Sequence, residues 1–274
     1  MAAELVACSF PEYLALDGVQ RSALEDFITE GPEYYEAAYV KREITKKVTP
    51  DMEFGQVFHD FVLGTNETRP LEIPRDALND DGHKKGSAWK QFAKENEGRI
   101  LMLPDAFSVL QKMLDKCMEH PWVRRFLEHK DRVVENVIAW DDPECGLRRK
   151  CRPDLMIPGQ VLVDFKTYKP TDFQTFSRGV AKRGYHRQSA FYDDGHAALY
   201  GKGVPFVFVA ARKDPPYSVR VLQIHDHDIA AASQQVDVGL QKLRRHYDTG
   251  VWKEHEWDEI KMLHLPPWEI PAED

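Results

Sequence analysis

The sequence predicts an α/β fold in which a mixed sheet of about five strands is flanked by helices and preceded by a helical region. Up to about residue 130, apolar residues recur at helical spacing; after it, short segments rich in branched and aromatic residues alternate with Gly, Pro and Asp. Residues 170–203 have helical spacing and are long enough for a crossover that returns to the same sheet.

Length and composition set the class of protein. With 274 residues and 42% hydrophobic content, the chain is large enough to bury a core, against roughly 150 residues per domain. We expect one domain over residues 1–274: a mainly helical part (1–130), a sheet core (131–250) and an acidic C-terminal arm (251–274). The sequence shows neither the ~18-residue apolar run of a membrane span nor the pattern of a secretion signal, which predicts a cytoplasmic protein without membrane contact.

The N-terminal part shows several helix signals. Ser22 and Glu25 have the spacing of a capping box, and Pro32 suits a first helical position. We predict a helix over 53–63, a long loop over 65–98 and a helix over 104–126.

The later part contains five strand candidates and a last amphipathic helix at 226–247. The strands are predicted at 133–140, 147–157, 161–168, 204–211 and 217–224.

The most informative stretch lies around the third of these strands. Asp164 and Lys166 are two residues apart, so both side chains leave the same face. Pro158-Gly159 marks a turn that brings Asp154 alongside Asp164 in a hairpin. A loop with an odd number of residues, such as 158–160, places the two carboxylates opposite each other, whereas a two-residue loop places them on opposite faces.

Two carboxylates and an ammonium group on one face favour a metal-dependent chemistry. Carboxylate oxygens are the ligands that Mg²⁺ and Mn²⁺ prefer, so we expect one or two such ions as cofactor. Lys166 would orient a water or neutralise charge on a phosphate undergoing hydrolysis. From these residues alone, a hairpin edge that merely faces water is an open alternative.

Four motifs in order extend this pattern. They are Gly55-Gln56-Val57-Phe58-His59, then Pro153-Asp154, then Asp164-Phe165-Lys166, then Gln188 with Tyr192 four residues later. Together they resemble the signatures of the PD-(D/E)xK nuclease superfamily, in the branch related to the RecB nuclease domain. The whole order is most similar to the C-terminal nuclease domain of RecE-type exodeoxyribonuclease VIII and its phage relatives, over nearly the entire chain.

The resemblance implies a role for each motif residue. Asp154, Asp164, His59 and the backbone carbonyl of Phe165 would hold metal, while Lys166, Gln188 and Tyr192 would complete the catalytic site. Glu135 is the only acid inside the apolar run 133–140, and we weigh metal support against an outward-facing position for it.

Charge distribution bears on the substrate. The net charge of −8 argues against a protein that coats nucleic acid, yet residues 147–187 contain ten basic residues against three acidic ones, a local net charge of +7. We predict a phosphate-contacting ridge at Arg178, Lys182, Arg183 and Arg187, with Arg149 and Arg152 as weaker DNA-binding candidates.

The resemblance implies a metal-dependent exonuclease that degrades duplex DNA from its ends, 5′ to 3′, in phage or bacterial recombination and repair. It also implies a bacterial host cytoplasm, a homo-oligomeric ring and a single-strand annealing partner. Two alternatives stay open: a Cas4-like or other RecB-like nuclease of different polarity, and a non-catalytic DNA-binding recombination module. The four cysteines contain no C-x-x-C pair and none follows Cys151, so no zinc site, disulfide framework or iron–sulfur cluster is expected.

Overall fold

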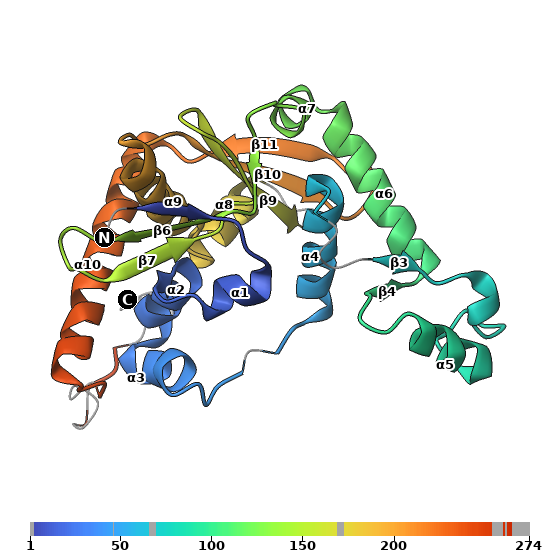
Figure 1. Cartoon of the computed structure of the whole chain (residues 1–274), viewed down its shortest axis with the longest axis horizontal. Coiled ribbons are helices and arrows are strands. Elements are labelled where there is room, and N and C mark those ends of the chain that lie inside the picture. The colour runs from blue at the N-terminus through green and yellow to red at the C-terminus, as the bar shows by residue number, and fades with distance from the viewer. Residues whose placement is uncertain are drawn as a thin grey trace, which may run out of the picture.

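The computed structural model describes residues 3–45, 47–65, 70–168, 173–253, 260 and 262–264 (Figure 1). The strands are β1 Glu4–Val6, β2 Val19–Gln20, β3 Leu71–Glu72, β4 Leu101–Met102, β5 Val133–Val134, β6 Val137–Asp141, β7 Arg148–Cys151, β8 Leu155–Ile157, β9 Val161–Tyr168, β10 Phe206–Arg212 and β11 Val219–Gln223. The helices are α1 Phe10–Ala15, α2 Arg21–Glu30, α3 Pro32–Tyr35, η1 Glu36–Val40, α4 Pro50–Leu63, η2 Arg75–Ala77, α5 Gly86–Glu95, α6 Pro104–Glu119, α7 Pro121–Leu127, α8 Phe173–Lys182, α9 Tyr185–Tyr200 and α10 Asp226–Thr249.

The predicted mixed sheet of five strands is confirmed, in the order β11-β10-β9-β8-β5. Only β9 and β10 run parallel in it, and α8 and α9 form the crossover between them. A second sheet of four strands, β1-β6-β7-β2, was not predicted. The N-terminal region is therefore not purely helical, because β1 and β2 form the two edges of this second sheet.

One bent hairpin joins the two sheets. The predicted strands 133–140 and 147–157 are each interrupted once, which separates β5 from β6 and β7 from β8. The partners Val134–Leu155 and Ile138–Cys151 lie four residues apart on both strands, so the break inserts no residue. Pro153 has no N–H for the ladder, and Glu135 has a left-handed backbone (φ 51°), so the regular pairing stops there.

Helices cover both faces of the five-stranded sheet. Side chains of Leu162 and Phe208 face one core with α2, α9 and α10, while Val163 and Val209 face another with α4, α6 and α7. This alternation follows from the two-residue period of a strand. It also directs Asp164 and Lys166 toward α9, and their neighbour Phe165 toward α4, where its ring lies edge-on to Phe58.

Two predictions for the N-terminal half are wrong. The loop predicted over 65–98 contains α5 and β3, which with β4 form a small projecting lobe in Figure 1. Trp89 and Phe92 pack there on a satellite core of Ile73, Ala77 and Leu78.

The capping box predicted at Ser22 is also wrong, because α2 begins at Arg21 after Gln20 and has no side-chain cap. A capping box does exist one helix earlier, between Ser9 and Glu12 of α1.

The C-terminal part begins as predicted with a long helix, α10. Trp252 then stacks on Tyr35, with ring centroids 5.6 Å apart. Most of the predicted acidic arm (251–274) lies outside the described residues. Within the described ranges, no helix combines the length and the apolar character needed to cross a membrane.

Candidate active site

The site forms where the two sheets separate. β9 pairs with β10 along most of its length. It pairs with β8 only from Val161 to Val163, because the chain bends away at Pro153 and Asp154. The backbone groups of Phe165 on the open side therefore need other partners. Its N–H donates to Asp154 Oδ2 (2.7 Å), and its carbonyl oxygen lies 2.6 Å from His59 Nε2.

The β8–β9 register determines how the carboxylates meet. Ile157 pairs with Val161 and Leu155 with Val163, so the connecting loop has three residues, 158–160. Continuing this register places Asp154 beside Asp164, as the odd-loop alternative predicts. The Asp164 side chain is only 4% exposed and that of Asp154 13%.

Asp164 contacts two other residues of the site. Its Oδ2 lies 2.7 Å from Lys166 Nζ, and its Oδ1 accepts a hydrogen bond from Gln188 Nε2 at 2.6 Å. The Lys166 ammonium also lies 4.8 Å from the centre of the Tyr185 ring. Gln188 and Tyr192 are one turn apart on α9, and both line the same pocket.

His59 reaches the site from α4. Its Nδ1 lies 3.5 Å from Asp154 Oδ2, in addition to the contact of Nε2 with the Phe165 carbonyl. One turn earlier, a Cβ at Gly55 would lie 3.9 Å from Thr167 Oγ1, so α4 passes close to β9 at this point. α4 thereby brings the histidine of the first motif to the carboxylates of the later ones.

Burial and mutual charge set the protonation of the cluster. Burial raises the pKa of Asp154, and Asp164 raises it further, against the opposing effects of His59 and Lys166. Burial acts against the charge of Lys166, but Asp164, Tyr185 and Asp154 outweigh it and raise the pKa of Lys166. Lys166 is therefore a cation at neutral pH.

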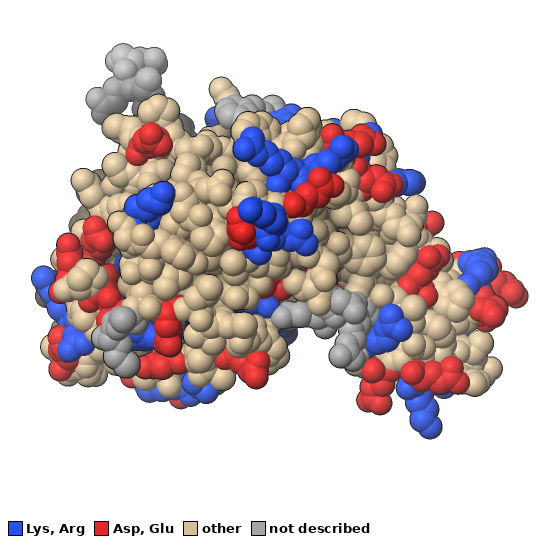
Figure 2. Space-filling model, turned by 45° about the horizontal axis from the view of Figure 1, so that its top comes forward, with Lys and Arg blue, Asp and Glu red and all other residues tan. Residues whose placement is uncertain are grey.

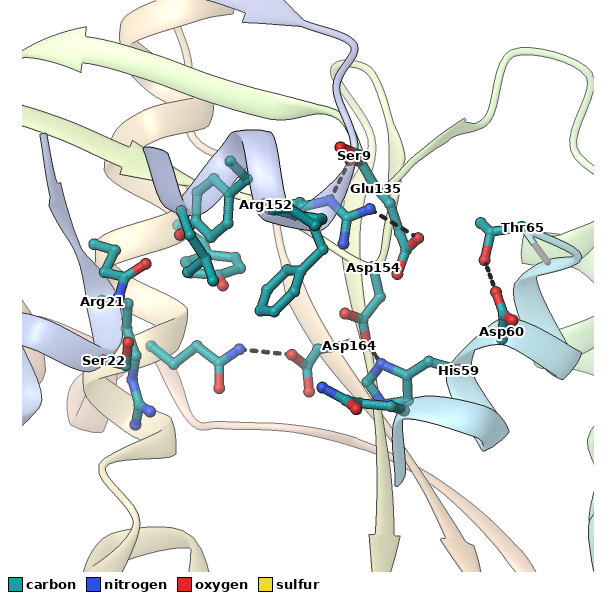
Figure 3. Close-up of a pocket in the computed structure, with 18 of the residues that line it drawn as sticks. Ser9, Arg21, Ser22, His59, Asp60, Thr65, Glu135, Arg152, Asp154 and Asp164 are labelled. Atoms are coloured by element: carbon teal, nitrogen blue, oxygen red, sulfur yellow. Dashed lines mark hydrogen bonds and ion pairs between the residues drawn. The ribbon is translucent and has the colours of Figure 1, made fainter. Parts of the chain in front are cut away.

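These residues line a pocket of about 890 Å³ (Figure 3). Figure 3 shows Arg21 and Ser22 of α2 on one side, His59 and Asp60 of α4 on the other, and Asp154 and Asp164 between them. Our sequence reasoning missed Arg21, since nothing in its neighbourhood marks it. Its guanidinium donates to the carbonyl of Arg183, so the junction of α8 and α9 lies at the pocket rim.

Glu135 lies at the break in the bent hairpin. Its carboxylate lies 3.1 Å from Arg152 Nη2, and its carbonyl accepts from Arg152 Nε at 2.8 Å. Both residues line the pocket (Figure 3). The pair bridges the two strands where the ladder is interrupted, so Glu135 is not simply outward-facing.

The predicted basic ridge is corrected in part. Arg178, Lys182 and Arg183 are exposed, as a ridge requires. Arg187 instead binds Glu25 through Nε and Nη2 of its guanidinium. Arg149 is 2% exposed and bridges Asp142 and Asp194, so it is not available to DNA.

The local charge of +7 therefore does not form one surface patch. Lys150, for example, is buried and donates to the carbonyls of Tyr13 and Leu16 at the end of α1. On the face that Figure 2 presents, basic and acidic side chains are interspersed, with no large area of one sign.

The donors at the site fit a hard divalent ion. Within the described ranges, no group of three His, Cys, Asp or Glu side chains already has metal-site spacing. However, Asp154 and His59 both contact the backbone of Phe165, and the carboxylate of Asp164 lines the same pocket as these two side chains. Gln188 Oε1 is buried there without a hydrogen-bond partner among the described residues. Such oxygens are the ligands that Mg²⁺ and Mn²⁺ prefer.

Comparisons with known proteins agree with this fold. A crystal structure of a provisionally named exonuclease from Eubacterium rectale superposes with a TM-score of 0.64 at 15% identity, covering 97% of this chain and 99% of that one.

The alkaline exonuclease LHK-Exo from Laribacter hongkongensis gives a TM-score of 0.28 at 15% identity, covering 70% of this chain and 97% of its own. Its complex with dAMP gives 0.24 at 16% identity, covering 72% and 100%. These two scores are too low to support an argument.

Sequence comparison identifies the family. A search of curated proteins finds no match. Residues 21–258 match the family model described as "PDDEXK-like domain of unknown function (DUF3799)". Because this match spans most of the chain, including all four motifs, the protein belongs to this PDDEXK-like family.

Proposed function

We propose that the protein is a divalent-metal-dependent DNA exonuclease that hydrolyses phosphodiester bonds from duplex ends. The observation that carries the proposal is the arrangement of Asp164, which binds Lys166 and Gln188 while Asp154 and His59 lie on the adjoining wall of one pocket. The exonuclease-like fold of the structural relative supports it. Polarity from 5′ to 3′, a ring of several copies and an annealing partner are expectations from the RecE-type resemblance.

Each residue of the site would have a distinct chemical role. Asp154, Asp164, the Phe165 carbonyl and His59 would hold the Mg²⁺ or Mn²⁺ ion. When bound, the ion supplies positive charge beside the scissile phosphate and lowers the pKa of the attacking water. Lys166 is fixed by Asp164 at 2.7 Å, and its charge would orient the water and stabilise the negative charge that develops on the phosphate.

Gln188 and Tyr192 would complete the wall that receives the substrate. The Gln188 amide nitrogen is bound to Asp164, which leaves its oxygen directed to a second partner such as a water. Exposed Arg178, Lys182 and Arg183 would contact phosphates of the strand at the rim. Arg21, in the pocket wall, adds a further cation for the same purpose.

The presence of every charged motif residue at the site favours an enzyme over a non-catalytic DNA-binding module. A binding module has no need of a buried carboxylate shared between an ammonium and an amide, since this arrangement is costly to bury. Basic residues on the surface would suffice for binding alone.

Hydrolysis of linear and closed circular duplex DNA, with Mg²⁺ or with EDTA, tests the proposal. We expect loss of linear DNA only with metal, and no loss in Asp164→Ala or Lys166→Ala. Asp115→Ala and Lys90→Ala remove exposed charges of the same types elsewhere and serve as matched controls. Degradation that persists in EDTA or in both site variants would refute the assigned site.

Labels at the 5′ and 3′ ends then determine polarity. Equal cutting of circular DNA would show an endonuclease and refute the proposed attack from ends.

A further inference from the structure

The short helix α1 contributes an apolar surface to the candidate active-site pocket. Figure 1 shows α1 between α2 and α4, the helices that supply opposite sides of that pocket. Phe10 and Leu14 of α1, which we call the apolar pair, both line the pocket and are 39% and 48% exposed. They are one turn apart, so their side chains lie on the same face of the helix. The pair precedes residue 21, where the family match begins, and it belongs to none of the four motifs.

Polar contacts at both ends hold α1 in place. At its start, Ser9 N–H donates to Glu12 Oε2 at 2.8 Å, and Ser9 Oγ accepts from the N–H of Glu12. At its end, the buried ammonium of Lys150 donates to the carbonyls of Tyr13 at 2.8 Å and Leu16 at 2.5 Å. Burying an ammonium is costly unless its hydrogen bonds are made, and here they fix α1 against β7. The exposure of the apolar pair is therefore a property of a firmly placed helix.

The Phe10 ring is also positioned from the side. The guanidinium of Arg152 lies 5.7 Å from the centre of the ring, and Arg152 is itself paired with Glu135 at the break in the bent hairpin. The buried ring of Tyr13 lies 6.1 Å from that of Phe10. Phe10 thus has neighbours that set its place, while a large part of its ring stays uncovered. An exposed aromatic ring held in a pocket suits a flat ligand.

The pocket combines two kinds of surface. Asp154, Asp164 and Lys166 give it charge, whereas the apolar pair gives it an uncharged surface. Figure 3 shows Ser9, where α1 begins, above Asp154 and Asp164 in that view. A nucleotide has the same division, because its phosphate is charged and its base is a flat ring with a π-face. Pockets of about 300–1,000 Å³ enclose small ligands, so one of about 890 Å³ can enclose a nucleotide.

From this geometry we propose that a base of the substrate strand stacks on the Phe10 ring beside Leu14, while the backbone of that strand lies at the carboxylates. The occupant is a nucleobase because the apolar pair lines the same pocket as the groups that would hold the metal and the phosphate. In a duplex each base is paired, so a base that lies on Phe10 has left its partner. The inference rests on the proposed function and gives α1 the task of holding an unpaired end.

Removing the base and the ring in combination tests the contact without hydrolysis. The substrates are linear duplexes that end in a few unpaired nucleotides, in which an abasic sugar replaces each unpaired nucleotide in turn and leaves every phosphate in place. The Kd of each is measured in EDTA. Because stacking on an aromatic ring contributes to the affinity for a base, the wild type should lose about fivefold or more at one position. In Phe10→Ala, the abasic sugar at that position should change the Kd little.

Two further variants separate the ring from the fold. Phe10→Tyr keeps a ring and should show the wild-type loss at the same position. Phe10→Leu keeps an apolar side chain without a ring, so it should behave as Phe10→Ala does and covers the case in which alanine unfolds α1. Circular dichroism checks the fold of each variant.

Trp122→Ala is the matched control for the ring. Trp122 is 54% exposed and lines a different pocket, beside α7. The abasic profile of this variant should equal that of the wild type. Equal profiles in the wild type and Phe10→Ala would overturn the proposal, as would a wild type that loses affinity at no position or binds none of the duplexes.

A second copy of the chain is the alternative occupant of the apolar pair. In that case, Phe10→Ala would lower the mass of the particle in analytical ultracentrifugation and leave the abasic profile unchanged. That pair of results would also overturn the proposal.

The two proposals fail in different ways. Coupling between Phe10 and one base, without hydrolysis in Mg²⁺, would refute the nuclease and leave the base contact. Hydrolysis of linear DNA by the wild type, without such coupling, would refute the base contact and leave the nuclease.

Discussion

Replacing Arg149 with methionine should lower the thermal stability of the protein and should not remove a direct contact with DNA. The Arg149 side chain is 3% exposed, with Nη1 3.0 Å from Asp142 Oδ2 and Nη2 2.8 Å from Asp194 Oδ2. Its guanidinium lies between two aromatic rings, 4.7 Å from Trp140 and 4.2 Å from Phe191. Methionine preserves much of the volume but leaves two carboxylates without their cation.

Removing one partner of a buried ion pair costs about 3–5 kcal/mol. With an unfolding entropy of about 2.1 cal/mol/K per residue, 274 residues give roughly 0.6 kcal/mol/K, so the midpoint should fall by about 5–9 °C. Thermal unfolding followed by circular dichroism measures this shift. Adding Asp142→Asn and Asp194→Asn to the variant should recover part of the loss, because no uncompensated charge then remains.

The matched control is Arg183→Met, at an exposed position on the predicted ridge. Its midpoint should stay near that of the wild type, since surface substitutions change stability by only about ±0.5 kcal/mol. Its affinity for DNA should fall instead. An Arg149→Met variant with unchanged stability and weakened DNA binding would refute this reasoning and restore the role that the sequence predicted.

Three further predictions concern the site and its support. Asp164→Asn and Lys166→Met should each lower hydrolysis by at least about 10²-fold while changing the Kd for DNA in EDTA little, because they act on transition-state charge; wild-type rates in either would contradict the site. Asp154→Asn should stabilise the metal-free protein at pH 7. Burial and then Asp164 raise the pKa of Asp154, so ionisation opposes folding; the gain should vanish below pH about 3.9, and a loss at pH 7 would contradict the shift. Gly195→Ala should destabilise by about 1–3 kcal/mol in chemical unfolding, because its Cβ would lie 2.8 Å from a Trp140 ring carbon; an unchanged midpoint would mean that the ring moves aside.

Local rules were sufficient to predict the β8–β9 hairpin. A strand of eight residues fixes the common face of Asp164 and Lys166, and the Pro158-Gly159 turn limits the possible registers to two. The choice between them depends on loop length, which the structure shows to be three residues. Bringing His59 and Gln188 to the same place depends on tertiary packing, so only the family resemblance could suggest it.

On the β5–β6 side, the bend between the two sheets had no clear sequence signal. Apolar residues continue on both sides of Glu135, so the run 133–140 reads as one strand. The left-handed conformation of Glu135 is supported by two contacts with Arg152 from the opposite strand, an interaction that no local pattern shows. The break matters because it frees the N–H and carbonyl of Phe165 for Asp154 and His59.

The basic run 148–150 shows why the basic residues that are clustered in the sequence do not form a basic patch on the surface. β7 is covered on both faces: Arg149 points to Asp194 of α9, while Lys150 points to the carbonyls that end α1. A strand in this position buries consecutive side chains, so each cation must find a partner inside the protein. Only residues on helices and connections at the rim keep their charge for a phosphate backbone. Variants that test the proposed DNA binding therefore belong on α8 and at its junction with α9, where Arg178, Lys182 and Arg183 are exposed, rather than on β7.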